Sequence, residues 1–237
     1  MPPASRAPYA ITHIFFDVDG TLVDFRASLR AGLEAAATLL SERTGRLVTP
    51  AVLTETRDRF YQQGRERRTL TEVRAASFQQ VLAERGVTDP DAAAEASRVF
   101  YEARDGALAA YDDVVEPLRV LRERGFRLAT ATNGNAALMR TPVMDLMHVL
   151  FGAEEAGLAK PHPAFFEAAL AKAGAETSRS LMVGDRIDND VAPALAAGMH
   201  GVLLDREGTV DTSADPGMPV IRSLRDLPSM VVLPDGP

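Results

Sequence analysis

The chain has 237 residues, of which 46% are hydrophobic and 25% charged, so it can bury one core or one and a half. Its formal net charge of -7 is opposite to the basic footprint of a nucleic-acid-binding protein, so we expect no nucleic-acid partner. The absence of cysteine excludes disulfides, thiolate catalysis and zinc–sulfur sites.

Neither the ends of the sequence nor its apolar runs resemble a targeting signal. Met1–Pro8 is rich in proline and no apolar h-region follows it, so we expect a loose tail and not a signal peptide. Residues 234–237 are expected to form a second loose end. No stretch approaches the roughly 20 apolar residues of a membrane helix. The sequence therefore predicts a cytoplasmic protein without membrane contact.

Short apolar segments alternate with helical patterns along the chain. The first, Ile11–Phe16, is typical of a buried parallel strand. Further strands are predicted, in chain order, at Phe126–Thr132, Ser180–Val183, Gly201–Leu204 and Val220–Ile221. Helices are predicted at Val114–Glu123, Pro163–Lys172 and Asp190–Ala197. This alternation predicts an α/β fold with a doubly wound, Rossmann-like parallel sheet.

The first two predicted strands are separated by about a hundred residues, which is too long for one crossover connection. From Arg26 to Ala110 apolar residues recur at helical spacing, and glycines and prolines divide the segment into about four helices. We therefore predict a helical domain at 26–110, inserted into a core made of residues 9–25 and 111–237.

Polar residues follow three of the predicted strands: Asp17 with Asp19, then Thr132–Asn133, then Asp185–Asp190. Ligand sites of open α/β sheets form at the carboxyl edge, so we expect these segments to converge. Several carboxylates need a compensating cation, and hard oxygen donors favour Mg²⁺. Lys160, in a proline-rich loop, adds a positive charge. Carboxylates, a metal and a lysine are what phosphoryl transfer requires.

Asp17 and Asp19 stand two residues apart at the end of the first strand. Two carboxylates in different environments can divide the roles of nucleophile and acid/base. Gly20 allows a sharp turn and a close approach of its amide to a phosphate. The pattern predicts a catalytic loop directly after the first strand.

Four segments resemble, in order, the motifs of the haloacid dehalogenase-like hydrolase superfamily. They are Asp17-Val18-Asp19-Gly20-Thr21-Leu22, Ala129-Thr130-Ala131-Thr132-Asn133, Lys160-Pro161 and Gly184-Asp185-Arg186-Ile187-Asp188-Asn189-Asp190. The helical insertion after the first motif is similar to the cap domain of one subgroup. That subgroup includes phosphoglycolate phosphatases, nucleotidases, β-phosphoglucomutase and haloacid dehalogenases.

The resemblance implies a Mg²⁺-dependent phosphatase that acts on a small phosphorylated metabolite through an aspartyl-phosphate. Asp17 would attack phosphorus, and Asp19 would protonate the leaving alcohol and then activate water. Thr132 would hydrogen-bond a phosphoryl oxygen, and Lys160 would pair with Asp17 and the phosphate. These four residues are the implied catalytic set.

The resemblance also implies how the metal and the substrate are held. The implied metal ligands are the Asp17 carboxylate, the Asp19 main-chain carbonyl and Asp185. Asp190 would not bind the metal directly and would act through a bound water or by orienting Lys160. Further candidates for substrate contact are the Gly20 and Thr21 amides and Asn133.

Several readings stay open at this point. Thr132 also fits a cap for a helix beginning near Asn135, and Asp188 fits a charge at a helix N-terminus. The cluster Gly64–Arg68 either recognises an anionic part of the substrate or forms a solvated helix surface. Phe25 stands where relatives often have a small hydroxyl residue, so the substrate of a relative does not transfer to this chain.

Three other functions compete with the phosphatase. A phosphomutase would pass the phosphoryl group to a second hydroxyl, and the motifs do not separate the two. A 2-haloacid dehalogenase is expected to lack the acidic residue two positions after the nucleophile, where this chain has Asp19. A catalytically silent phosphate-binding protein is a further alternative. Both a monomer and a homodimer are compatible with the sequence.

Overall fold

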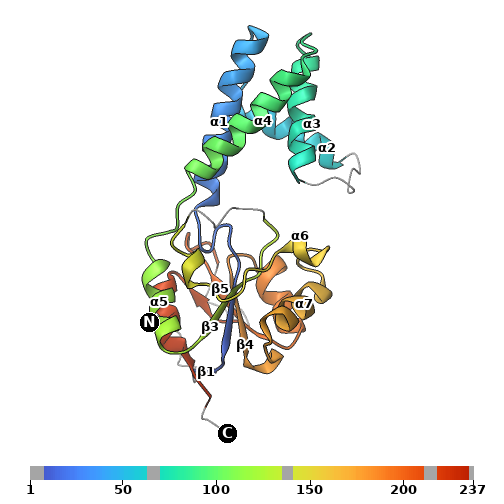
Figure 1. Ribbon diagram of the computed structural model, residues 1–237. Helices are drawn as coiled ribbons and strands as arrows, with labels where there is room; N and C mark the ends of the chain where they lie inside the picture. The colour runs from blue at the N-terminus through green and yellow to red at the C-terminus, as the bar shows by residue number, and fades with distance from the viewer. Residues whose placement is uncertain (1–7, 63–69, 135–140, 211–217, 235–237) are drawn as a thin grey trace. The chain divides into compact units, whose positions relative to one another are not determined.

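The computed structural model of the chain describes residues 8–62, 70–134, 141–210 and 218–234. The chain divides into two compact units (Figure 1). The core unit comprises Met1–Asp24 and Ala109–Pro237, and the helical unit comprises Phe25–Leu108. The predicted loose ends, the arginine cluster at 64–68 and the helix start near Asn135 lie almost entirely outside the described residues.

A five-stranded sheet forms the centre of the core unit, with the strand order β3-β2-β4-β5-β6 and every pair parallel. The strands are β2 (His13–Phe16), β3 (Arg127–Thr130), β4 (Ser180–Gly184), β5 (His200–Leu204) and β6 (Val220–Ile221). Every residue of β2 and β4 is buried, as expected for strands covered on both faces. The predicted fold class is confirmed.

Helices cover both faces of this sheet, with α5 (Val115–Glu123) and α7 (Pro163–Ala173) on opposite sides (Figure 1). Phe15 of β2 packs in the apolar cluster under α7. Because neighbouring strand residues face opposite sides, Ile14 and Phe16 are buried on the other face. The shorter segments are η2 (Met144–Leu146), α6 (Ala153–Ala156), η3 (Thr177–Arg179) and η5 (Leu224–Met230).

The helix predicted at Asp190–Ala197 is wrong in its first part. Ile187–Val191 forms a π-helical turn (η4), and the α-helix that follows (α8) covers only Ala192–Ala196. The amides of Asp190 and Val191 both donate to the Arg186 carbonyl, at 2.9 and 3.3 Å, which widens the turn. The wide turn brings the Asp190 side chain back to the carboxyl end of β4.

Two very short strands lie outside the main sheet. β1 (Tyr9–Ala10) pairs in parallel with β7 (Val231–Val232) and joins the start of the core unit to its end. The strand predicted at Ile11–Phe16 is therefore shorter, because the chain bends between β1 and His13. A two-residue strand has no periodicity that a sequence pattern could reveal.

The helical unit contains, within its described residues, α1 (Phe25–Thr44), α2 (Pro50–Gln62), α3 (Leu70–Ala83) and α4 (Pro90–Gly106). α1 packs along α4, and the rings of Phe78 and Phe100 lie 6.0 Å apart in the shared core. Pro90 and the side chain of Asp89 begin α4, because the Asp89 carboxylate accepts from the first free amides of the helix. None of the described helices combines the length and the apolar composition needed to cross a bilayer.

Candidate active site

The candidate site lies at the carboxyl edge of the main sheet, directly after β2. The Asp17 amide donates to the Val183 carbonyl over 2.9 Å, and the Ala131 amide donates to the Phe16 carbonyl over 2.8 Å. These bonds continue the ladders of β2 beyond its last residue. They fix Asp17 between the ends of β4 and β3, so residues that follow all three strands meet there.

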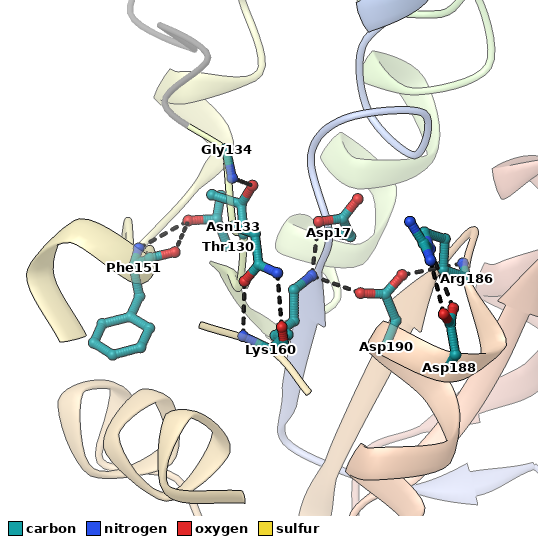
Figure 2. A network of polar contacts seen from close by, with 10 residues as sticks. Asp17, Thr130, Asn133, Gly134, Phe151, Lys160, Arg186, Asp188 and Asp190 are labelled. Carbon is teal, nitrogen blue, oxygen red and sulfur yellow. Dashed lines mark hydrogen bonds and ion pairs between the residues drawn. The ribbon is translucent and has the colours of Figure 1, made fainter. Parts of the chain in front are cut away.

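Lys160 lies between two carboxylates. Its ammonium donates to Oδ1 of Asp17 over 2.7 Å and to Oδ1 of Asp190 over 2.6 Å (Figure 2). Only 4% of Lys160 is exposed to solvent. Burial opposes its charge, but the two carboxylates outweigh burial and raise the pKa of the ammonium above its ordinary value. The structure thus brings together Asp17, Lys160 and Asp190 as a buried charged group.

The main chain of Lys160 is held by Asn133. Oδ1 of Asn133 accepts from the Lys160 amide at 2.7 Å, and its Nδ2 donates to the Lys160 carbonyl at 2.9 Å (Figure 2). The sequence suggested a substrate contact for Asn133, whereas both polar atoms of its side chain are engaged by Lys160. The residues are 27 positions apart, so no local pattern signals this role. Asn133 fixes the point from which the lysine side chain extends.

The loop after Asp17 is closed by its own main-chain hydrogen bonds. The Gly20 amide donates to the Val23 carbonyl at 3.0 Å, and the Thr21 amide donates to the Val18 carbonyl at 3.3 Å. Each of these two N–H groups thus already donates within the loop, and their contact with a phosphate stays a prediction. The sharp turn expected at Gly20 is present.

Gly20 has φ of 87°, a conformation that favours glycine. A Cβ atom at this position would lie only 2.5 Å from Oδ2 of Asp185. Glycine is therefore required both by the turn and by the close approach of the carboxylate. The Asp17 loop and the segment after β4 are brought into direct contact here.

Asp19 and Thr132 approach each other across Gly134. A Cβ atom at Gly134 would collide with Oδ2 of Asp19 and would lie 3.3 Å from Oγ1 of Thr132. The Thr132 hydroxyl accepts from the Gly134 amide at 2.9 Å, which is a local cap of the kind considered from the sequence. Accepting this bond leaves the hydroxyl proton able to donate to a ligand. Capping and phosphate contact are thus compatible at Thr132.

Carboxylate oxygens of Asp17, Asp185 and Asp190 lie within 4.8 Å of one another. Burial, then repulsion from Asp190, raises the pKa of Asp185. Burial also raises the pKa of Asp17, against the effect of Lys160. In Asp190, burial and the charge of Asp17 raise the pKa to about 6. The three carboxylates carry more negative charge than one ammonium neutralises.

This group suits a hard divalent cation. Oδ1 of Asp185 is buried and has no hydrogen-bond partner among the described residues. Both oxygens of Asp190 are engaged, one by Lys160 and the other by the Arg186 amide at 3.1 Å. Asp185 and Asp17 are thus better placed than Asp190 to offer an oxygen. An all-oxygen donor set of this kind fits Mg²⁺.

Asp188 lies apart from this group. Its carboxylate pairs with the Arg186 guanidinium at 2.7 Å, and 69% of its side chain is exposed (Figure 2). The hydrogen bond from Arg186 lowers the pKa of Asp188. The role of Asp188 was open in the sequence, and the structure places it in a surface ion pair.

The charged side chains at this edge of the sheet indicate the class of protein. A buried carboxylate beside a lysine, with further acids at the carboxyl edge of an α/β sheet, is an arrangement that suits nucleophilic or metal-assisted chemistry. Residues 11–198 match the family model of the haloacid dehalogenase-like hydrolases. The chain belongs to this family and is an enzyme of the hydrolase class.

Comparisons with individual proteins agree with this assignment. The chain is 30% identical over 219 residues to ribulose-1,5-bisphosphate 5-phosphatase of Halopiger xanaduensis, covering 86% of this chain and 90% of that protein. It is 33% identical to glyceraldehyde 3-phosphate phosphatase of Methanopyrus kandleri, over 50% of this chain and 53% of that protein. It is similar to the crystal structure of 2-haloacid dehalogenase from Pseudomonas syringae, with a TM-score of 0.78 and 29% identity, covering 93% and 97% of the two chains.

Proposed function

We propose that the chain is a Mg²⁺-dependent phosphatase of small phosphorylated metabolites, with Asp17 as the nucleophile. The observation that carries the proposal is the Lys160 ammonium, 2.7 Å from the buried Asp17 carboxylate and beside two further acids. Two relatives, the phosphatases of glyceraldehyde 3-phosphate and of ribulose 1,5-bisphosphate, support this substrate class.

In this mechanism Asp17 attacks phosphorus and becomes an aspartyl-phosphate. Lys160 holds the attacking carboxylate in one orientation and offsets the charge of the phosphoryl oxygens. The Thr132 hydroxyl donates to a phosphoryl oxygen. Mg²⁺, when bound, would supply further charge stabilisation, held by the side chains of Asp17 and Asp185 and the main-chain carbonyl of Asp19.

Asp19 carries the protons of both half-reactions. It first donates a proton to the leaving alcohol, and as a carboxylate it then takes one from the water that attacks the aspartyl-phosphate. The position of its side chain, beside Gly134 and near Thr132, supports this role. Asp19 therefore lies close to the hydroxyl that we propose to contact the phosphoryl group. Asp190 acts through Lys160, whose ammonium it binds.

We further propose that the helical unit, Phe25–Leu108, serves as a cap that selects the substrate. A cap that closes excludes water and sets selectivity through the contacts it makes with the leaving group. Phosphoglycolate, sugar phosphates and nucleoside monophosphates are the candidates. We retain a phosphomutase as an alternative, because transfer to a second hydroxyl would use the same aspartyl-phosphate.

A dehalogenase is the second candidate, favoured by the similarity to the 2-haloacid dehalogenase structure. The two reactions share a carboxylate nucleophile but differ in the need for an acid at the leaving group. A halide leaves without a proton, whereas an alkoxide requires one. Asp19, two residues after the nucleophile, therefore supports phosphate-ester cleavage.

The test is a screen of phosphorylated metabolites alongside 2-chloropropionate, each with Mg²⁺ and with EDTA. We expect phosphate release that needs Mg²⁺ and is abolished by Asp17→Asn and Asp19→Asn. The matched control is Asp226→Asn, which removes an exposed carboxylate from η5 of the same unit. Halide release, or phosphate release that survives EDTA or Asp17→Asn, would contradict the proposal.

A further inference from the structure

Arg206, which follows β5, reaches back to the loop that carries Asp17 and Asp19. One arm of its guanidinium, Nη2, donates to the Thr21 carbonyl over 2.8 Å. The other arm, Nη1, donates to both carboxylate oxygens of Asp113, at 2.7 and 2.8 Å. The guanidinium carbon lies 4.0 Å from the ring centroid of Tyr111, within the range of a cation–π contact.

Asp113 is in turn hydrogen-bonded to the segment that follows β6. Its Oδ2 accepts from the Ser223 hydroxyl at 2.7 Å and from the Leu224 amide at 3.0 Å. Only 6% of Asp113 is exposed. Burial opposes its charge, but the hydrogen bonds from Ser223, Arg206 and Leu224 outweigh burial and lower its pKa. Asp113 is therefore an ionised, fully engaged partner for Arg206 at neutral pH.

The Thr21 carbonyl is the point at which Arg206 contacts the catalytic loop. The Val18 carbonyl accepts from the Leu22 and Val23 amides at 2.9 and 3.1 Å, so the loop is a compact turn. The Tyr111 amide donates to the Leu22 carbonyl at 3.2 Å, which ties the turn to the segment that also carries Asp113. Movement of the Thr21 carbonyl would therefore shift Asp19, two residues before it in the same turn.

We propose that Arg206 is a positioning residue for the catalytic loop. It holds the Thr21 carbonyl with one arm and binds Asp113 with the other, so that the turn carrying Asp19 keeps one orientation. Arg206 lies beyond the residues matched by the family model, 11–198, so its contacts with Thr21 and Asp113 are additional to the family motifs. The predicted effect of Arg206 on catalysis rests on the proposed phosphatase function, whereas its predicted effect on the order of the loop does not.

The chain offers a matched control for Arg206. Arg124 also donates from both arms to main-chain carbonyls, to Pro228 at 2.5 Å and Val231 at 2.7 Å. Its guanidinium carbon lies 5.2 Å from the ring centroid of Phe126. Arg124→Ala thus removes two main-chain hydrogen bonds and a cation–π contact from the same unit without touching the catalytic loop.

The first measurement is hydrogen exchange of the peptide that spans 18–23, made without substrate. We expect Arg206→Ala to speed exchange of its protected amides by about 10-fold or more, because the contacts of Arg206 no longer oppose local opening. Arg124→Ala should leave this peptide unchanged. Equal exchange of the peptide in the Arg206→Ala protein and the wild type would overturn the proposal.

The second measurement separates kcat from KM for hydrolysis of p-nitrophenyl phosphate with saturating Mg²⁺. We expect Arg206→Ala to lower kcat by about 10- to 100-fold, the effect of a small misplacement of a catalytic group, with little change in KM. Asp113→Asn should lower kcat less, and the double variant should lose no more than Arg206→Ala alone. A kcat equal to that of Arg124→Ala would overturn the proposal.

Arg206→Lys keeps the charge but has one nitrogen in place of the two arms, so it cannot hold both partners in the same geometry. We expect it to recover part of kcat and of the exchange protection, and it replaces Arg206→Ala if that variant does not fold. Should the wild type hydrolyse no phosphate ester, the proposed function fails, whereas the exchange measurement still decides whether Arg206 holds the loop.

Discussion

The ammonium nitrogen of Lys160 lies 2.7 Å from Oδ1 of Asp17, in a part of the core unit that solvent barely reaches. The same nitrogen binds Asp190, so one positive charge serves two carboxylates, with Asp185 close by. Burial and mutual repulsion raise the pKa of all three acids. This excess of negative charge is the reason why we propose that a divalent cation binds here together with the phosphoryl group.

Replacement of Asp17, the proposed nucleophile, should abolish turnover and leave the fold intact. Asn is nearly isosteric with Asp but has no carboxylate to attack phosphorus, so we expect Asp17→Asn to lower kcat by at least about 1000-fold. The measurement is phosphate release under single-turnover conditions, with circular dichroism to verify folding. Asp226→Asn should retain the wild-type rate, and substantial turnover by Asp17→Asn would exclude Asp17 as the nucleophile.

Removal of the lysine should destabilise the protein strongly. Lys160→Met leaves buried carboxylates without their ammonium, and breaking a buried pair costs about 3–5 kcal/mol. We expect a loss of this size in the free energy of unfolding by urea in EDTA. The loss should be smaller with Mg²⁺, which replaces part of the missing charge. The matched variant Lys172→Met removes an exposed pair with Glu155 and should cost about 1 kcal/mol or less.

The stability of the metal-free protein should depend on the protonation of Asp190. Its pKa is raised to about 6, so below that pH the folded chain holds a proton that the unfolded chain releases near pH 4. The free energy of unfolding therefore falls as the pH rises from about 4 to about 6 through this group. In EDTA, we expect wild type to lose stability relative to Asp190→Asn between about pH 4 and about pH 6.

This comparison isolates Asp190 from groups that act in the opposite direction. Burial lowers the pKa of His13 and His148, so their protonation at acidic pH favours the unfolded chain. Both histidines are present in wild type and in Asp190→Asn, so their contribution cancels in the difference. Urea unfolding at the two pH values gives that difference. A difference that does not change with pH would contradict the raised pKa.

Magnesium should stabilise the folded chain through Asp185. A ligand that binds only the folded state adds about 2.7 kcal/mol when its concentration is 100 times Kd. We expect the melting temperature to rise with Mg²⁺ in wild type and to stay constant in Asp185→Asn, which lacks the buried oxygen without a protein partner. The control is Asp188→Asn, whose exposed carboxylate pairs with Arg186. If the melting temperature of Asp188→Asn also fails to rise with Mg²⁺, the metal does not bind through Asp185 as proposed.

The apolar segments of the sequence predict the main strands well because each is a buried run between helical patterns. β4 and β5 begin at or within one residue of the predicted positions. One prediction fails where a long-range contact decides the local structure, because β1 exists only where β7 lies beside it. Another fails at the π-helical turn of Ile187–Val191, where the Val191 amide reaches the Arg186 carbonyl five residues back, a local choice that apolar spacing does not reveal.

The same distinction applies to the site. Asp17, Lys160 and Asp190 are identifiable from their motifs, although they are far apart in the sequence. The hydrogen bonds of Asn133 to Lys160, and those of Arg206 to Thr21 and Asp113, join residues with no fixed spacing. Residues that position catalytic groups through main-chain contacts leave no pattern in one sequence.

The most direct test of the central claim is the mass of the enzyme quenched in acid during turnover of a phosphorylated substrate. Acid preserves an acyl phosphate long enough for peptide mass spectrometry. We expect the peptide containing Asp17 to gain the mass of one phosphoryl group, and the same peptide of Asp17→Asn to gain none. A phosphoryl group on another residue, or active turnover with no phosphorylated peptide, would contradict nucleophilic catalysis by Asp17.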